Sequence, residues 1–60
     1  MITIEEKKHL SSTVLFSLRD LITDPIWIKA FKYYNLHFPN DRPLPLSCRG
    51  CYSKVLKFIL

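Results

Sequence analysis

The stretch that decides the fold of this chain is residues 47–60, SCRGCYSKVLKFIL, which holds both cysteines and the only glycine of the sequence. Its apolar side chains recur at the spacing of one broad helical face, and its basic side chains fall on the opposite face. We predict a helix over residues 47–60 with Ser47 as its N-cap. Gly50 lies in the first turn of that helix, where glycine costs about 1 kcal/mol relative to alanine, so we expect another backbone or a ligand to approach it closely.

The small size of the chain limits how much apolar surface it can hide. It has 60 residues, of which 48% are hydrophobic. A domain of this length buries only about 60% of the surface that its unfolded chain exposes. We therefore expect docking onto a protein partner or self-association. The alternative is a small monomer with an unusually apolar surface.

The N-terminal part predicts a helix over residues 3–22. Thr3 and Glu6 have the spacing of a capping box, in which each side chain bonds the other residue's backbone amide. Apolar side chains then recur at helical spacing and predict a buried stripe. The members of this stripe are Leu10, Val14, Leu15, Leu18, Leu21 and Ile22.

A second helix is predicted over residues 25–37. Asp24 is a strong N-cap, and Pro25 is favoured at the first helical position. Because the residue before a proline avoids the helical region, the first helix must stop just before, and the two helices form a tight corner or a hairpin. We expect the broad apolar face of the second helix to form the core. Its members are Ile26, Trp27, Ala30, Phe31, Tyr33, Tyr34, His37 and Phe38.

Residues 38–46 predict a loop, because three prolines there disfavour helix. Leu44 and Leu46 are placed to pin this loop onto the helices. No strand pattern occurs in the chain. We therefore predict a single all-α domain over residues 1–60, a compact three-helix fold in which helices 3–22 and 25–37 form a hairpin and helix 47–60 closes the core.

Three apolar side chains lie off the predicted apolar stripes: Phe16, Ile28 and Leu36. Isolated exposed apolar residues are common, so these positions can be incidental. Together with the surplus of apolar residues, they favour a partner-binding surface. Our leading hypothesis is a small structural or interaction protein that docks into a larger assembly or self-associates. We expect no enzymatic activity, because neither a catalytic grouping nor a glycine-rich phosphate loop is present in the sequence.

The distribution of charge suggests a nucleic-acid-binding domain as the alternative. Residues 1–24 carry three basic and four acidic side chains, whereas residues 25–60 carry six basic and one acidic. Three short helices with such a basic part are compatible with a helix-turn-helix arrangement. A solvated polar face would look the same in sequence. The candidate contacts to phosphate are Arg49, Ser53, Lys54 and Lys57 of the last helix, with Lys29 and Lys32 of the second.

The pair Cys48-x-x-Cys51 has three interpretations. Two cysteines at this spacing supply half of a tetrahedral zinc site, for which His37 is the better third ligand and His9 the other histidine. The order of these residues does not match the usual zinc-finger spacing. A redox-active dithiol at a helix N-terminus is the second interpretation. The favoured interpretation is two buried thiols that pack as small apolar groups, with no cofactor, and zinc is the alternative.

The expected location is the cytoplasm. No run reaches the roughly 18 consecutive apolar residues that a spanning helix needs, so we expect no membrane insertion. The first charged residues are acidic, unlike the basic-then-apolar order of a secretory signal. Two cysteines in a reducing compartment are more often thiols or ligands than a structural disulfide.

Two segments carry a resemblance to a group of viral proteins. The stretch from Asp24-Pro25-Ile26-Trp27 to Phe31-Lys32-Tyr33-Tyr34-Asn35, and the stretch CRGCYSKV at residues 48–55, resemble small proteins of tailed bacteriophages that infect gut Bacteroidetes. The similar segments cover about half of the chain. The resemblance implies the cytoplasm of a host cell or a virion as the location, and a virion component or a phage–host interaction protein as the role. It implies no activity and no site residues.

Overall fold

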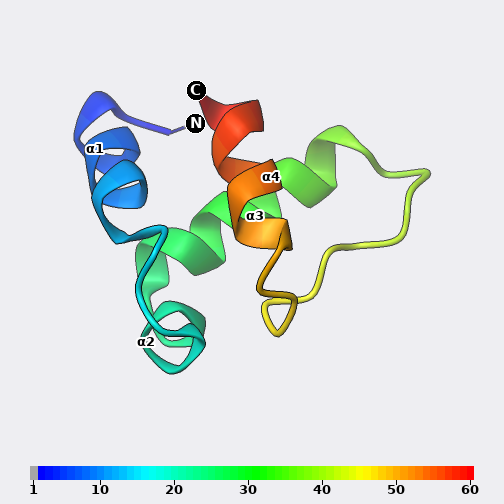
Figure 1. Ribbon diagram of the computed structural model, residues 1–60. Helices are drawn as coiled ribbons and strands as arrows, with labels where there is room; N and C mark the ends of the chain where they lie inside the picture. The colour runs from blue at the N-terminus through cyan, green and yellow to red at the C-terminus, as the bar shows by residue number, and fades with distance from the viewer. Residues whose placement is uncertain (1) are drawn as a thin grey trace.

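A computed structural model describes residues 2–60 and shows an all-helical domain, which confirms the predicted fold class. It has four helices: α1 (Ile4–Thr13), α2 (Leu18–Ile22), α3 (Pro25–His37) and α4 (Cys51–Ile59). Figure 1 shows α3 crossing the middle of the molecule, with α1 and α4 beside it. In residues 2–60, none of the helices is both long and apolar enough to cross a membrane.

The predicted helix over residues 3–22 is wrong, because the structure divides it into α1 and α2. At the end of α1, the hydroxyls of Ser12 and Thr13 donate to the carbonyl of His9, at 3.0 and 2.7 Å. Such bonds compete with continuation of a helix. Ser17 then adopts an extended backbone with φ −62° and ψ 150° and begins α2.

The break also changes which side chains are buried. Leu10 and Leu21 are buried as predicted, whereas Leu15 is 85% exposed and Ile22 is 41% exposed. Leu15 lies in the turn between the two helices, outside any helical stripe. Because α2 starts afresh at Leu18, the helical phase assumed for a single helix does not apply to Ile22.

Both predicted N-caps in the first half of the chain are confirmed. The Glu6 amide donates to Thr3 Oγ1 at 3.1 Å, and the Thr3 amide donates to Glu6 Oε1 at 2.9 Å, which completes the capping box. Asp24 Oδ1 accepts from the Ile26 amide at 2.9 Å, with Pro25 at the start of α3. The predicted bounds 25–37 of this helix agree with the structure.

The C-terminal helix is shorter than predicted, and Ser47 is not its cap. The link before α4 is made of turns in which the Cys48 amide donates to the Pro45 carbonyl and the Cys51 amide donates to the Cys48 carbonyl, both at 3.1 Å. Gly50 is the N-cap, and no side chain bonds the helix start there. The close approach expected at Gly50 is also wrong, because a methyl group at this residue would meet no atom within 4 Å.

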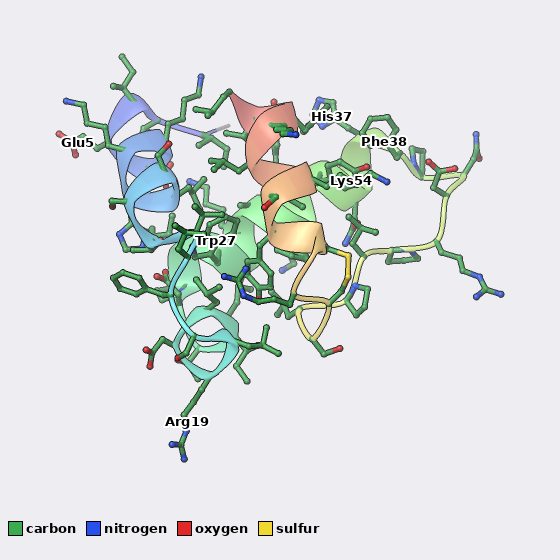
Figure 2. All side chains as sticks on the ribbon, viewed as in Figure 1. Glu5, Arg19, Trp27, His37, Phe38 and Lys54 are labelled. Atoms are coloured by element: carbon green, nitrogen blue, oxygen red, sulfur yellow. A yellow bond between two sulfur atoms is a disulfide. The ribbon has the colours of Figure 1, made fainter. Side chains whose placement is uncertain are left out.

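The core is built on the aromatic face of α3. Trp27 and Tyr52 are fully buried, with ring centroids 4.9 Å apart, and Phe31 lies 4.7 Å from Tyr52. Figure 2 shows Trp27 in the middle of the molecule. The remaining buried apolar residues are Ile2, Leu10, Leu21, Ala30, Tyr34, Val55 and Ile59.

The last residues of the predicted core face lie outside the core. His37 is exposed and Phe38 is 37% exposed. Both lie where α3 ends, and Figure 2 shows them at that end. They pack on Phe58 with ring centroids 5.3 and 5.2 Å away, so they form a second, surface aromatic cluster.

The loop that joins α3 to α4 is attached to the helices by side chains. Leu44 and Leu46 pack against the core, as predicted. The Asn35 side chain accepts from the Leu44 amide at 3.0 Å and donates to the Leu44 carbonyl at 3.4 Å. The Tyr52 hydroxyl donates to the Leu46 carbonyl at 2.7 Å. The side chain of Asn35 on α3 therefore fixes the position of the loop.

A buried polar contact connects α1 to α3. Trp27 Nε1 donates to Thr13 Oγ1 at 2.8 Å, and this hydroxyl in turn donates to the His9 carbonyl. The hydroxyl therefore acts as both donor and acceptor. An indole N–H without an acceptor in the core would cost about 1–3 kcal/mol.

We predict that Thr13→Val lowers the free energy of unfolding by about 1–3 kcal/mol, because it leaves the Trp27 indole N–H unpaired. Thr13→Ser keeps the hydroxyl and should lose less. Ser12→Ala is the matched control, since this exposed hydroxyl bonds the same carbonyl, and its effect should stay within about 0.5 kcal/mol. Urea titrations measure all three variants, and equal effects of Thr13→Val and Ser12→Ala would contradict the prediction.

Candidate functional site

A shallow groove lies between α1 and the C-terminal end of α4. Its volume is about 410 Å³. The two apolar side chains that line it are among the most exposed in the molecule, with Ile4 73% and Leu60 70% exposed. The other residues that line the groove are Lys7, Lys8, Ser11 and Ser12.

The lysines of this groove are available to a ligand. Among residues 2–60, the ion pairs are His9–Asp24 and Lys29–Glu6, so Lys7 and Lys8 have no carboxylate partner. Ser12 already donates to the His9 carbonyl of its own helix. The groove therefore offers apolar contact at both ends and positive charge from α1.

A second hollow, of about 490 Å³, lies between α1 and α3, but internal bonds already occupy its polar groups. Lys29 Nζ lies 2.9 Å from Glu6 Oε2, and His9 Nε2 lies 2.6 Å from Asp24 Oδ2. Both contacts join the two helices. We therefore interpret this hollow as part of the packing of α1 on α3, and the groove as the candidate binding site.

The hydrogen bonds and ion pairs between α1 and the start of α3 change the pKa values of the carboxyl groups that take part in them. Burial raises the pKa of Asp24, but the hydrogen bonds from His9 and from the Ile26 amide outweigh it, so the pKa lies below its ordinary value of 3.8. The Thr3 amide and Lys29 lower the pKa of Glu6 from 4.5 to about 2. Both carboxyls are therefore ionised at neutral pH. For Tyr52, burial raises the pKa of the hydroxyl, which stays a hydrogen-bond donor.

The three apolar residues predicted to bind a partner are exposed, but none of them lines either hollow. Phe16 is 50% exposed in the turn before α2, and Ile28 and Leu36 are 39% and 76% exposed on α3. Lys32 lies between the last two on the same outer face of α3. Their exposure is confirmed, and their role in binding stays a prediction.

The predicted phosphate-binding residues are all exposed, but one is already paired. Lys29 bonds both oxygens of Glu6, at 3.0 and 2.9 Å. Lys54 and Lys57 share a face of α4 with Ser53, and Arg49 lies in the link just before the helix. In the described part of the chain, Arg49, Lys54 and Lys57 form no ion pair with a carboxylate.

The structure joins Cys48 and Cys51 in a disulfide, so the favoured interpretation as buried free thiols is wrong. Both residues are half-buried. In the structure the disulfide occupies both sulfurs, and His37 Nδ1 lies 3.1 Å from the Tyr33 carbonyl, so zinc binding by these three residues stays a prediction for the reduced chain. Within residues 2–60, no three histidine, cysteine or acidic side chains gather closely enough to hold a metal ion.

No family model, curated protein or solved structure matches this chain. The resemblance to bacteriophage proteins, and the location and role that it implies, therefore stay predictions.

Sequence reasoning missed the groove, although part of its signal was present. Two lysines follow Ile4 within a turn, but Ile4 itself falls on the predicted apolar stripe, because it precedes Ile22 by 18 residues, or five full helical turns. No local pattern in the sequence, however, predicts that Leu60 lies near Ile4. The two residues meet only because α1 and α4 both pack on α3.

We predict that Asp24→Asn reduces the acid dependence of stability. Since the pKa of folded Asp24 lies below 3.8, the stabilisation is fully present above the unfolded pKa and is lost as pH falls through the folded pKa. The variant should be less stable than the wild type at pH 6 by about 1 kcal/mol, because it loses the charged contact with His9. This difference should shrink as the pH falls below about 4, the ordinary pKa of an aspartate.

Urea titrations across this pH range measure the effect. The matched control is Asp41→Asn, which removes an exposed carboxyl in the loop and should leave the pH dependence close to that of the wild type. A constant difference between Asp24→Asn and the wild type at all pH values would contradict a role for the Asp24 charge.

Proposed function

We propose that the protein is an interaction module that docks onto an acidic, apolar segment of a partner protein through the groove between α1 and the end of α4. The observation that carries this proposal is that Ile4 and Leu60 stand exposed on the same groove as the unpaired Lys7 and Lys8. A binding role without catalysis explains why exposed apolar side chains and unpaired lysines lie together on this groove.

The apolar side chains provide the driving force for docking. Burial of an exposed isoleucine or leucine contributes about 1.5–3 kcal/mol each. Ile4 and Leu60 are exposed in the free chain because a core of ten buried apolar residues leaves no room for them. A partner that covers both side chains therefore gains affinity at little cost in rearrangement of this domain.

The charge of the groove selects the kind of partner. Lys7 and Lys8 favour carboxylates on the facing surface, and the chain carries a net charge of +4. A second copy in a two-fold dimer would bring the same lysines toward each other across the interface. The charges thus favour a different, acidic protein over self-association, and a partner in a virion or a host cell would agree with the phage resemblance.

Two synthetic amphipathic helical peptides test this proposal. They share leucines along one face and carry glutamate or lysine at the polar positions, and fluorescence anisotropy measures their binding to the untagged protein. We expect the acidic peptide to bind at least about tenfold more tightly than the basic one. Lys7→Glu/Lys8→Glu should abolish this preference, and Ile4→Ser should weaken binding of the acidic peptide.

The matched control is Lys54→Glu/Lys57→Glu, which makes the same change of charge at two residues of α4 that do not line the groove, and should keep the preference for the acidic peptide. Equal binding of both peptides, or a preference that survives Lys7→Glu/Lys8→Glu, would overturn the proposal. So would a concentration-dependent dimer that Ile4→Lys dissociates, since a second copy would then occupy the groove.

A second candidate function is nucleic-acid binding through α4 and the link before it. The observation that favours it is that Arg49, Ser53, Lys54 and Lys57 are all exposed, with no carboxylate paired to the three cations among the described residues. Cations of this kind bind phosphates and release counterions. Lys32 is exposed as well, whereas Lys29 is occupied by Glu6.

Binding to a single-stranded oligonucleotide at several salt concentrations tests this second candidate. Affinity should fall steeply as salt rises, and Lys54→Glu/Lys57→Glu should reduce both the affinity and the salt dependence. Lys7→Glu/Lys8→Glu serves as the control with the same change of net charge. Binding that is absent, insensitive to salt or reduced equally by the two double variants would remove this function.

A further inference from the structure

We propose that the Cys48–Cys51 disulfide is a redox-active site that exchanges electrons with dithiols of other proteins. This inference is independent of the groove and of the proposed partner. It rests on the position of the disulfide relative to the core, on the exposure of its residues, on the bonds that hold the backbone around it and on the charges nearby.

The disulfide does not hold the fold together. The buried residues of α4 are Tyr52, Val55 and Ile59, whereas both cysteines are only partly buried and Cys51 packs against the edge of the core. The bridge joins residues only three apart in the sequence, so it closes a very short loop and removes little freedom from the unfolded chain. The domain can therefore keep its core in both redox states.

The backbone around the cysteines is positioned without the disulfide. The Cys48 amide donates to the Pro45 carbonyl, and the Cys51 amide donates to the Cys48 carbonyl. The buried Tyr52 holds the preceding segment through the bond from its hydroxyl to the Leu46 carbonyl at 2.7 Å. These bonds would keep the two thiols close together after reduction, so the bridge can form again without a search through other conformations.

Both sulfurs lie in surroundings that favour thiolates. Both cysteine residues keep part of their surface exposed to solvent, and a reacting thiol would approach the bridge from that side. Cys51 begins α4, and the N-terminus of a helix stabilises negative charge. Arg49 lies between the cysteines and Lys54 follows one turn later, while the sequence after Asp41 contains no acidic residue. A thiolate released here is therefore a stable leaving group.

The reaction is a two-electron exchange with a dithiol. A thiolate of the dithiol attacks one sulfur of the bridge, the Cys48–Cys51 bond breaks, and the other cysteine leaves as a thiolate that takes up a proton. The second thiol of the dithiol loses its proton and attacks the mixed disulfide. The products are a disulfide in the former dithiol and two thiols in this protein, and the reverse reaction reduces a disulfide.

Equilibration of the full chain in buffers of reduced and oxidised glutathione gives the first test. Alkylation and mass spectrometry count free thiols, and far-ultraviolet circular dichroism reports the fold. We expect the dithiol and disulfide forms of the protein to coexist across these mixtures and to have the same helical content. A bridge that stays closed in excess reduced glutathione would overturn the proposal, and so would loss of the fold on reduction.

Single-cysteine variants supply the second test, with a disulfide-bonded peptide as the probe. Of Cys48→Ser and Cys51→Ser, at least one should form a mixed disulfide with the peptide. Arg49→Glu should slow exchange of the disulfide form with dithiothreitol by about threefold to tenfold, whereas Arg49→Lys should stay within about twofold of the wild type. Absence of a mixed disulfide with both variants, or equal rates for the two Arg49 variants, would overturn the proposal.

The same double variant that tests the groove separates the two proposals. Lys7→Glu/Lys8→Glu changes charges on α1, outside the cysteine segment, and should leave the rate of disulfide exchange unchanged. Failure of peptide binding with normal exchange would overturn the groove alone. Normal peptide binding without exchange would overturn the redox site alone.

Discussion

The structure depends on one buried indole. Trp27 is fully buried, and its N–H needs an acceptor inside the core, which Thr13 supplies. The same hydroxyl bonds the His9 carbonyl, and the His9 ring bonds Asp24, the residue that caps α3. One set of contacts therefore ends α1, starts α3 and fixes how the two helices pack. Removal of a side chain of this size from a core costs about 3–5 kcal/mol, a large share of the stability of a small domain.

The limited size of the core explains the apolar surface. Ten apolar side chains are buried, and they come from all four helices and from Ile2. The chain is too short to enclose more, so large apolar side chains remain exposed. Some are dispersed, as Leu15 and Leu36 are, whereas Ile4 and Leu60 converge on one groove that also has lysines. This convergence is the observation on which the proposed docking site rests.

Local signals in the sequence predicted the parts of the fold that depend on local chemistry. The capping box at Thr3, the Asp24-Pro25 start and the full length of α3 are specified within a few residues of where they act. The break after Thr13 was missed for two reasons. It depends on a hydroxyl group that bonds a carbonyl of its own helix, and on a hydrogen bond to the same hydroxyl from Trp27, which is 14 residues away in the sequence.

The candidate sites were also predictable only where they consist of residues close together in the sequence. The cysteine pair and the basic face of α4 are local patterns and could be found in the sequence, although their spacing did not reveal the bonding state of the sulfurs. The groove joins residues from opposite ends of the chain, so no local window contains it. The role of Asn35 was missed as well, because its partner at Leu44 lies across an irregular loop.

The meeting of Ile4 and Leu60 on one groove has a practical consequence for work with this protein. An affinity tag or a fluorescent fusion attached after Leu60 would emerge beside the groove, because Leu60 lines it, and would cover the proposed docking surface. A pull-down with bait of that kind would report the behaviour of the fusion. A label at Arg42, which is exposed in the loop before α4 and does not line the groove, leaves the groove open.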